Sequence, residues 1–191
     1  MRIGMVRHFP VQEAWPGGWL TSEDLQQWRV RYEASEVIVG PIDVRAVAWQ
    51  RCFSSDLKRA YVTAQAAYAG TIVQSPLLRE AEMLPFATGR LRLTVWSWHW
   101  VFRLAWLTGH KSQRPARDDL HRRVREMADL LEAEPVDTLV VSHGGIMVFL
   151  RKELLRRGFQ GPNFRLAEHG RLYVFERTET AMNHHDCKRN P

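Results

Sequence analysis

The sequence predicts an α/β fold: a three-layer α/β/α sandwich with a mostly parallel central sheet. Short apolar segments, several of them rich in β-branched residues, alternate along the chain with longer amphipathic segments. This alternation is typical of a parallel sheet that helices cover on both faces. The chain of 191 residues fits a single domain over residues 1–191, and its composition, 45% hydrophobic and 25% charged, is that of a soluble globular protein.

Five segments are predicted as strands because they are short and apolar. In chain order they are Arg2–Val6, Ala46–Phe53, Thr71–Gln74, Asp137–Ser142 and Leu172–Glu176. Four further segments carry apolar residues at helical spacing, as Leu25, Trp28 and Tyr32 do in the first of them. These predicted helices are Ser22–Ala34, Ser55–Tyr68, Asp118–Ala133 and Gly145–Arg157.

Residues 83–113 interrupt the alternation. Trp96, Trp98, Trp100 and Trp106 crowd into this segment. Alternation of Trp with Ser and His fits a strand, whereas the spacing of Trp96, Trp100 and Arg103 fits a helix. We expect a helical insertion that packs over one end of the sheet. Its aromatic residues would serve as core packing, as a lid or pocket wall, or as both.

Composition narrows the class of protein. The formal net charge is +6, but the excess lies in scattered pairs such as Arg156-Arg157 rather than in a dense basic stripe with aromatic residues, so we expect no nucleic-acid partner. Small phosphorylated ligands suit the charge. No apolar stretch is long enough to span a bilayer, and the N-terminus does not read as a signal peptide, so we expect no membrane partner. Two cysteines, Cys52 and Cys187, favour a cytoplasmic location.

Side chains that can bind anions or transfer protons follow each of the first four predicted strands. They are Arg7 and His8, Arg59, Glu80 and Glu82, and His143. Because ligands bind beyond the carboxyl ends of parallel strands, we expect these side chains to meet at one edge of the sheet. Ser54 or Ser55 could cap the helix that carries Arg59.

This set of side chains suits phosphoryl transfer. Two guanidinium groups can bind phosphate oxygens, a neutral imidazole can attack phosphorus, and a second imidazole can donate to the equatorial oxygens. A carboxyl group can protonate the leaving alkoxide and then deprotonate a water. Gly144 and Gly145 permit a tight turn that exposes backbone N–H groups at a helix start, which is a further anion site. Such chemistry needs no metal and no other cofactor.

Taken in order, these motifs resemble those of the histidine phosphatase (phosphoglycerate mutase-like) superfamily. Arg7-His8-Phe9 is similar to its Arg-His-Gly motif, and residues 54–64, SSDLKRAYVTA, are similar to its Ser-Asp-Leu-x-Arg-Ala-x-x-Thr-Ala segment. Leu78-Arg79-Glu80 resembles its Leu-x-Glu segment, and residues 142–145 resemble its Ser-His-Gly-Gly segment. The likeness runs from Met1 to the end of the helix after His143.

The resemblance implies a role for each site residue. His8 would be the phosphorylated nucleophile, while Arg7, Arg59 and His143 would hold the phosphoryl group. Glu80 would act as the acid and then as the base. The resemblance also implies that residues 83–113 are an insertion over the pocket. The function implied is a metal-independent phosphomonoesterase that forms a covalent phosphohistidine on a small phosphorylated metabolite.

The sequence departs from the family pattern beside the nucleophile and after the acid. Phe9, followed by Pro10, replaces the usual Gly, and the Phe9 side chain could line the pocket. Glu82 is an alternative to Glu80 as the acid. A second hypothesis is a phosphoglycerate mutase-type isomerase. It is disfavoured because the sequence shows no evident match to the longer insertion and C-terminal tail of the mutases. A non-catalytic phosphate-binding module is a third, and a homodimer is left open.

The remaining polar clusters have ordinary structural interpretations. We expect the run from His184 to Cys187 to be a solvated tail rather than a set of metal ligands. The pairs Trp28-Arg29 and Tyr32-Glu33 are expected to pack a helix, and His169 to be a surface or core histidine. Arg114, Arg117, Arg122 and Arg123 are expected on a solvated helix face, from which one could reach the pocket.

Overall fold

A five-stranded sheet forms the centre of the computed structural model, which describes residues 1–82 and 89–178. The strands are β1 (Arg2–Arg7), β3 (Arg51–Ser55), β4 (Ile72–Ser75), β6 (Thr138–Ser142) and β7 (Leu172–Glu176). Their order is β4-β3-β6-β1-β7, and all run parallel except β7, which pairs antiparallel with β1 at one edge. The register sets Arg7 beside Ser142 and Ser55 beside Ser75, so the carboxyl ends of four strands lie together.

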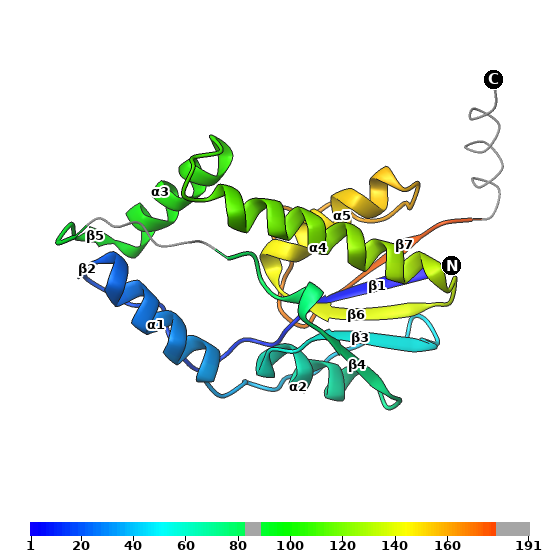
Figure 1. Ribbon diagram of the computed structural model, residues 1–191. Coiled ribbons are helices and arrows are strands. Elements are labelled where there is room, and N and C mark those ends of the chain that lie inside the picture. Colours follow the sequence, from blue (N-terminus) through cyan, green and yellow to red (C-terminus); the bar gives the residue numbers. More distant parts are fainter. Residues whose placement is uncertain (83–88, 179–191) are drawn as a thin grey trace, which may run out of the picture.

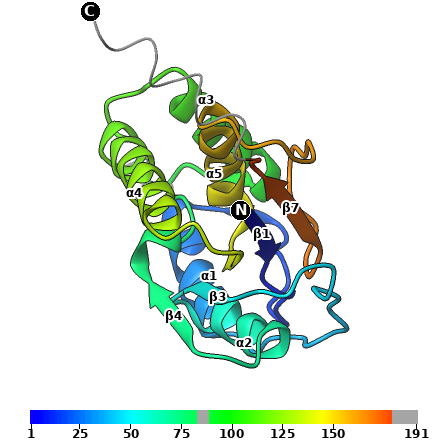
Figure 2. The same ribbon diagram turned by 90° about the vertical axis from the view of Figure 1, so that its right-hand side faces the viewer.

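Helices cover both faces of this sheet (Figures 1 and 2). Helices α4 (Arg114–Ala133) and α5 (Gly144–Arg156) lie on one face, and α2 (Lys58–Ala67) lies on the other. Successive side chains of a strand point to opposite faces of the sheet, so each strand contributes to a hydrophobic core on both faces. Ile3 and Met5 of β1 pack in the cluster under α4 and α5, whereas Val6 packs in the cluster under α2. The predicted three-layer α/β/α sandwich is confirmed.

A smaller group of elements projects beyond the carboxyl ends of the strands, at the left of Figure 1. It contains β2 (Trp19–Leu20), α1 (Ser22–Ala34), β5 (Leu93–Thr94) and α3 (Val95–Leu107), and β2 pairs antiparallel with β5. The Trp98 indole N–H of α3 donates to the Leu20 carbonyl oxygen at 2.7 Å, which joins α3 to the start of α1. The helix expected within residues 83–113 is present as α3, and residues 83–88 of that segment lie outside the described part.

The predicted elements are all present, and they differ from the structure mainly at their starts. Strand β3 begins at Arg51 rather than Ala46, because residues 45–47 form a turn and the Trp49 indole donates to the Val44 carbonyl oxygen at 2.7 Å. Helix α4 begins four residues early, at Arg114, with a proline in its first turn, where the missing N–H costs nothing. A short 3₁₀ helix, η1 (Pro76–Leu78), follows β4 and leads into the segment that carries Glu80.

Helix α2 begins at Lys58, and its N-cap is Leu57, which makes no side-chain capping bond. The expectation that Ser54 or Ser55 caps this helix is therefore wrong, although the Ser55 hydroxyl oxygen accepts from the Leu57 N–H at 3.4 Å, just before the helix. Within the described residues, no helix is both long enough and apolar enough to cross a membrane.

Candidate active site

His8 lies directly after β1 and is almost completely buried, with 2% of its surface exposed. Its backbone N–H donates to the Ser142 carbonyl oxygen of β6 at 2.9 Å, which extends the strand pairing to this residue. The ring atom Nδ1 lies 2.5 Å from the Phe9 carbonyl oxygen. Because a carbonyl oxygen only accepts, Nδ1 carries the proton and the neutral ring has its lone pair on Nε2.

Arg59 faces the lone pair on His8 Nε2. It comes from the first turn of α2, and its Nε lies 3.3 Å from His8 Nε2, to which it donates. Arg59 is 5% exposed, and its guanidinium group lies over the ring of Tyr32, 5.2 Å from the ring centroid. The predicted convergence of Arg59 on His8 is thus present in the structure.

His143 completes the core of the site at the N-cap of α5. The centroids of the His8 and His143 rings are 5.0 Å apart. His143 Nε2 lies 2.9 Å from the Ser55 hydroxyl oxygen. When this hydroxyl donates to Nε2, the proton of the neutral His143 ring lies on Nδ1, which can then donate to a ligand. The sequence suggested Ser54 or Ser55 only as a helix cap, and this contact of Ser55 was not predicted.

Several buried donors of the site have nothing to donate to. Within the described residues, five buried side-chain nitrogen or oxygen atoms lack a hydrogen-bond partner, and three of them are Arg7 Nε, Arg59 Nη1 and His143 Nδ1. Arg7 is held by a bond from Nη1 to the Ala167 carbonyl oxygen at 2.9 Å. Buried polar groups normally have partners, and these three donors are suited to bind the acceptor oxygens of an anion.

Burial keeps both imidazoles neutral. It lowers the pKa of His8 to about 3, with further lowering from the charges of Arg59, His169 and Arg7 and partial opposition from the Phe9 carbonyl bond. Burial also holds the pKa of His143 well below its ordinary value, aided by Arg59. At neutral pH His8 therefore presents an unprotonated Nε2, which is the form that can act as a nucleophile.

The Glu80 carboxylate lies at the start of α5. Its Oε1 accepts from the backbone N–H groups of Ala81 at 2.8 Å and Ile146 at 3.0 Å, and its Oε2 accepts from that of Gly145 at 3.1 Å. The sequence predicted an anion site at the backbone amides of Gly144 and Gly145. That expectation needs correction for Gly145, since in the structure the anion held by its N–H is Glu80 itself.

Two glycines make room for charged side chains at this helix start. A Cβ atom on Gly145 would lie 2.5 Å from Glu80 Oε1, and one on Gly144 would lie 2.8 Å from Leu166 Cδ1 and 3.3 Å from Arg7 Nε. The Gly-Gly pair predicted for a tight turn therefore also allows Arg7 and Glu80 to approach the backbone closely.

Arg123 of α4 holds the segment that carries Glu80. It is 7% exposed, and its guanidinium donates to the carbonyl oxygens of Arg79 at 2.7 Å and Leu77 at 3.3 Å. Its Nε donates to Asp119 at 2.7 Å. The expectation that Arg123 lies on a solvated helix face is wrong, because the segment before Glu80 packs against α4 and covers it.

Glu82 and Glu80 have different surroundings. The Glu82 side chain is 56% exposed and forms an ion pair of 3.2 Å with Arg29 of α1. Glu80 is half-buried, and its carboxylate contacts the helix that His143 caps. Of the two candidate acids, Glu80 is the one in contact with the histidine-bearing turn.

Phe9 contributes to the site through its backbone. Its side chain is 2% exposed and packs against Gly170, whose φ of +68° is a conformation that favours glycine. Its N–H donates to the Thr63 hydroxyl oxygen at 2.8 Å, and its carbonyl oxygen fixes the His8 ring. The structure thus gives the Phe9 carbonyl a positioning role, and places the ring against Gly170.

His169 is a site residue that sequence reasoning missed. Its Nδ1 lies 2.5 Å from the His8 carbonyl oxygen, and the two ring centroids are 5.1 Å apart. The available signal was its place just before β7. Because β7 is antiparallel to β1, the residues that precede it lie at the same sheet edge as the residues that follow β1.

A family model that represents the histidine phosphatase superfamily (branch 1) matches the sequence over residues 42–186, which is more than half of the chain. The chain belongs to the histidine phosphatase superfamily. The matched range begins after Arg7 and His8, so the assignment of these two residues rests on the geometry above.

Solved structures share the fold of this histidine phosphatase superfamily member. The α-ribazole phosphatase of Shigella flexneri has a TM-score of 0.55 at 17% identity, covering 94% of this chain and 92% of that one. A mycobacterial glucosyl-3-phosphoglycerate phosphatase has a TM-score of 0.51 at 23% identity, covering 81% and 79%. No curated protein matches the sequence.

Residues 1–82 and 89–178 contain no group of three or more His, Cys, Asp or Glu side chains arranged to hold a metal ion. The run from His184 to Cys187 lies outside the described residues.

The depressed pKa of His8 predicts an acid-dependent loss of stability. Between the native pKa of about 3 and the ordinary value of 6.5, the unfolded chain binds a proton that native His8 does not. Stability therefore falls as the pH falls through this range, and the loss from pH 7 to pH 5 is about 2 kcal/mol for this residue. The His8→Gln variant lacks this contribution. From pH 7 to pH 5, its free energy of unfolding should therefore decrease by about 2 kcal/mol less than that of the wild type. Urea titrations of both proteins at the two pH values measure the difference, and equal losses would contradict the burial argument.

Proposed function

We propose that this protein is a phosphomonoesterase that acts on a small phosphorylated metabolite through a covalent phosphohistidine at His8. The observation that carries the proposal is the cluster of three unpaired buried donors around a neutral imidazole. A phosphate monoester supplies both the oxygens that these donors lack and the phosphorus atom that the imidazole can attack. Membership of the superfamily, and the two phosphatases among the structural neighbours, agree with this reaction class.

In the proposed first step, the Nε2 lone pair of His8 attacks phosphorus and the bond from phosphorus to the alcohol oxygen breaks. Arg7, Arg59 and His143 donate to the phosphoryl oxygens, where charge develops in the transition state. The Phe9 carbonyl oxygen keeps the proton of His8 on Nδ1 and so aims Nε2 at the substrate. Arg59 Nε, which donates to Nε2 in the free protein, would release it for attack.

Glu80 is the proposed acid of the first step and base of the second. Protonated, it would give its proton to the departing alkoxide; ionised, it would take a proton from the water that attacks the phosphohistidine. Arg123 holds the segment before it, and the amides of α5 fix its carboxylate at the start of that helix. The product of the second step is inorganic phosphate, and His8 returns to its neutral form.

The proposal predicts hydrolysis that depends on His8. Phosphate release from p-nitrophenyl phosphate and a panel of alkyl phosphates, measured with EDTA present, should fall to background in His8→Ala. Arg59→Ala should lose about 10²–10³-fold in rate, because it removes a charge-stabilising donor. Arg45→Ala, whose arginine side chain is 88% exposed, should retain full activity and serves as the matched control.

Activity that survives in His8→Ala would rule out this nucleophile. Predominant isomerisation of phosphoglycerates would show a mutase, and phosphate binding without turnover would show a binding module.

The two acidic candidates can be separated by leaving group. Glu80→Gln should slow alkyl phosphates by about 10²–10⁴-fold and p-nitrophenyl phosphate far less, because p-nitrophenolate leaves without a proton. Glu82→Gln, which alters an exposed ion pair with Arg29, should change neither rate by more than about twofold. Steady-state kcat/KM values for both substrates test this, and a larger leaving-group effect in Glu82→Gln would move the acid to Glu82.

A further inference from the structure

Three aromatic rings form a continuous series that leads away from Arg59. The Tyr32 ring lies under the Arg59 guanidinium, 5.2 Å from its centroid. The Trp28 ring lies 5.1 Å from that of Tyr32, one turn away on α1. The Trp15 ring is stacked on Trp28 with centroids 4.8 Å apart and an interplanar angle of 24°. The series therefore joins a phosphate-site arginine to a tryptophan at the surface.

The inner end of this series belongs to the phosphate site. Arg59 is 5% exposed and its Nη1 has no partner among the described residues. The Tyr32 ring, which lies against the Arg59 guanidinium, therefore borders the phosphate site. A group attached to a phosphate held by Arg7 and Arg59 would leave the site next to Tyr32.

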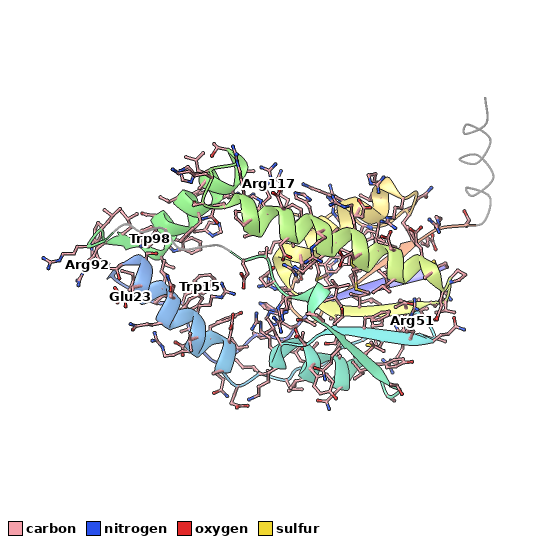
Figure 3. All side chains as sticks on the ribbon, in the orientation of Figure 1. Trp15, Glu23, Arg51, Arg92, Trp98 and Arg117 are labelled. Atoms are coloured by element: carbon pink, nitrogen blue, oxygen red, sulfur yellow. The ribbon has the colours of Figure 1, made fainter. Side chains whose placement is uncertain are left out.

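The outer end is a tryptophan that packing does not explain. Trp15 is 67% exposed, because Trp28 covers one face of its ring and the other face remains in solvent. Figure 3 shows Trp15 beside α1, on the side that faces α4 and the carboxyl ends of the strands. The expectation that Trp28 and Tyr32 merely pack a helix is incomplete, since their ring contacts continue out to this exposed surface.

The segment that carries Trp15 is fixed to α1. The Trp28 indole N–H donates to the Ala14 carbonyl oxygen at 2.9 Å, and the Glu13 N–H donates to the Ser35 hydroxyl oxygen at 2.9 Å. Arg31 forms an ion pair of 3.2 Å with Glu13. The exposed ring face is therefore held in place before any ligand arrives, which lowers the entropic cost of binding to it.

Resting on the phosphomonoesterase function proposed above, we propose that Tyr32, Trp28 and Trp15 form the subsite for the alcohol part of the substrate. The ligand class that it fits is a phosphate monoester whose alcohol carries a planar aromatic or heteroaromatic ring, as a nucleoside 5′-monophosphate does. The phosphate engages Arg7 and Arg59, while the ring stacks along the aromatic series with Trp15 as its outer face. Stacking of this kind accepts many planar rings, because it reads a π face rather than a hydrogen-bond pattern.

A pair of substrates isolates the contribution of the ring. Adenosine 5′-monophosphate and ribose 5-phosphate share the phosphate and the leaving 5′-oxygen and differ in the base. The wild-type kcat/KM should be about tenfold or more higher for the nucleotide, which is the size of one base–aromatic stacking interaction. Trp15→Ala should remove most of this preference by lowering the nucleotide value and leaving the ribose 5-phosphate value unchanged.

Trp96→Ala is the matched control. Trp96 is 72% exposed on α3 and lies two residues from Trp98, whose indole faces Leu20 at the start of α1, so Trp96 points away from α1. This variant should keep the wild-type preference for the nucleotide. Loss of preference in Trp96→Ala equal to that in Trp15→Ala would overturn the assignment of the subsite to Trp15.

Failure of the subsite and failure of the proposed function give different results. Equal wild-type kcat/KM values for the two substrates, or an equal decrease of both in Trp15→Ala, would overturn the subsite and leave the phosphatase intact. Absence of phosphate release from every ester would overturn the proposed function instead. Calorimetric titration of the His8→Ala variant with the two compounds then still tests the subsite. Tighter binding of the nucleotide that Trp15→Ala abolishes supports it, and equal affinities overturn it.

Discussion

The burial of His8 is the constraint on which the rest of the site depends. An imidazole in water is partly protonated near neutral pH, whereas His8, with 2% of its surface exposed and two guanidinium groups nearby, has a pKa of about 3 and keeps its lone pair. The Phe9 carbonyl oxygen then decides which nitrogen holds that lone pair. The same burial leaves donors of Arg7, Arg59 and His143 unpaired, at a cost that an anion bound in the site would offset.

The sheet makes this arrangement possible because each side chain of the site is carried by a different, rigid element. Arg7 ends β1, Arg59 begins α2, and His143 begins α5, while α4 supports the Glu80 segment through Arg123. Positions set by strand pairing and helix packing are more exact than positions set by a loop alone. By contrast, the aromatic series that we assign to the alcohol lies on α1 and the segment before it, outside the five-stranded sheet. The chemistry and the choice of substrate would therefore reside in separate parts of the fold.

The fold and the polar ends of the strands were predictable from the sequence, because buried parallel strands are continuous apolar runs and their carboxyl ends share an edge. The contacts of Ser55, Arg123 and His169 were not predictable in this way. Each depends on an approach between segments distant in sequence: Ser55 meets the start of α5, Arg123 meets the segment after η1, and His169 meets β1 through the antiparallel β7. Local pattern likewise could not show that Glu80 holds the amides of α5, because the sequence contains both partners but not their separation.

A crystal structure of the protein with orthovanadate bound tests the central assignment most directly, since vanadate mimics the five-coordinate phosphorus of the transition state. The account predicts vanadium bonded to His8 Nε2, with its oxygens within hydrogen-bond distance of Arg7 Nε, Arg59 Nη1 and His143 Nδ1. Vanadate bound at another place, or bound here without contact to these three donors, would contradict it.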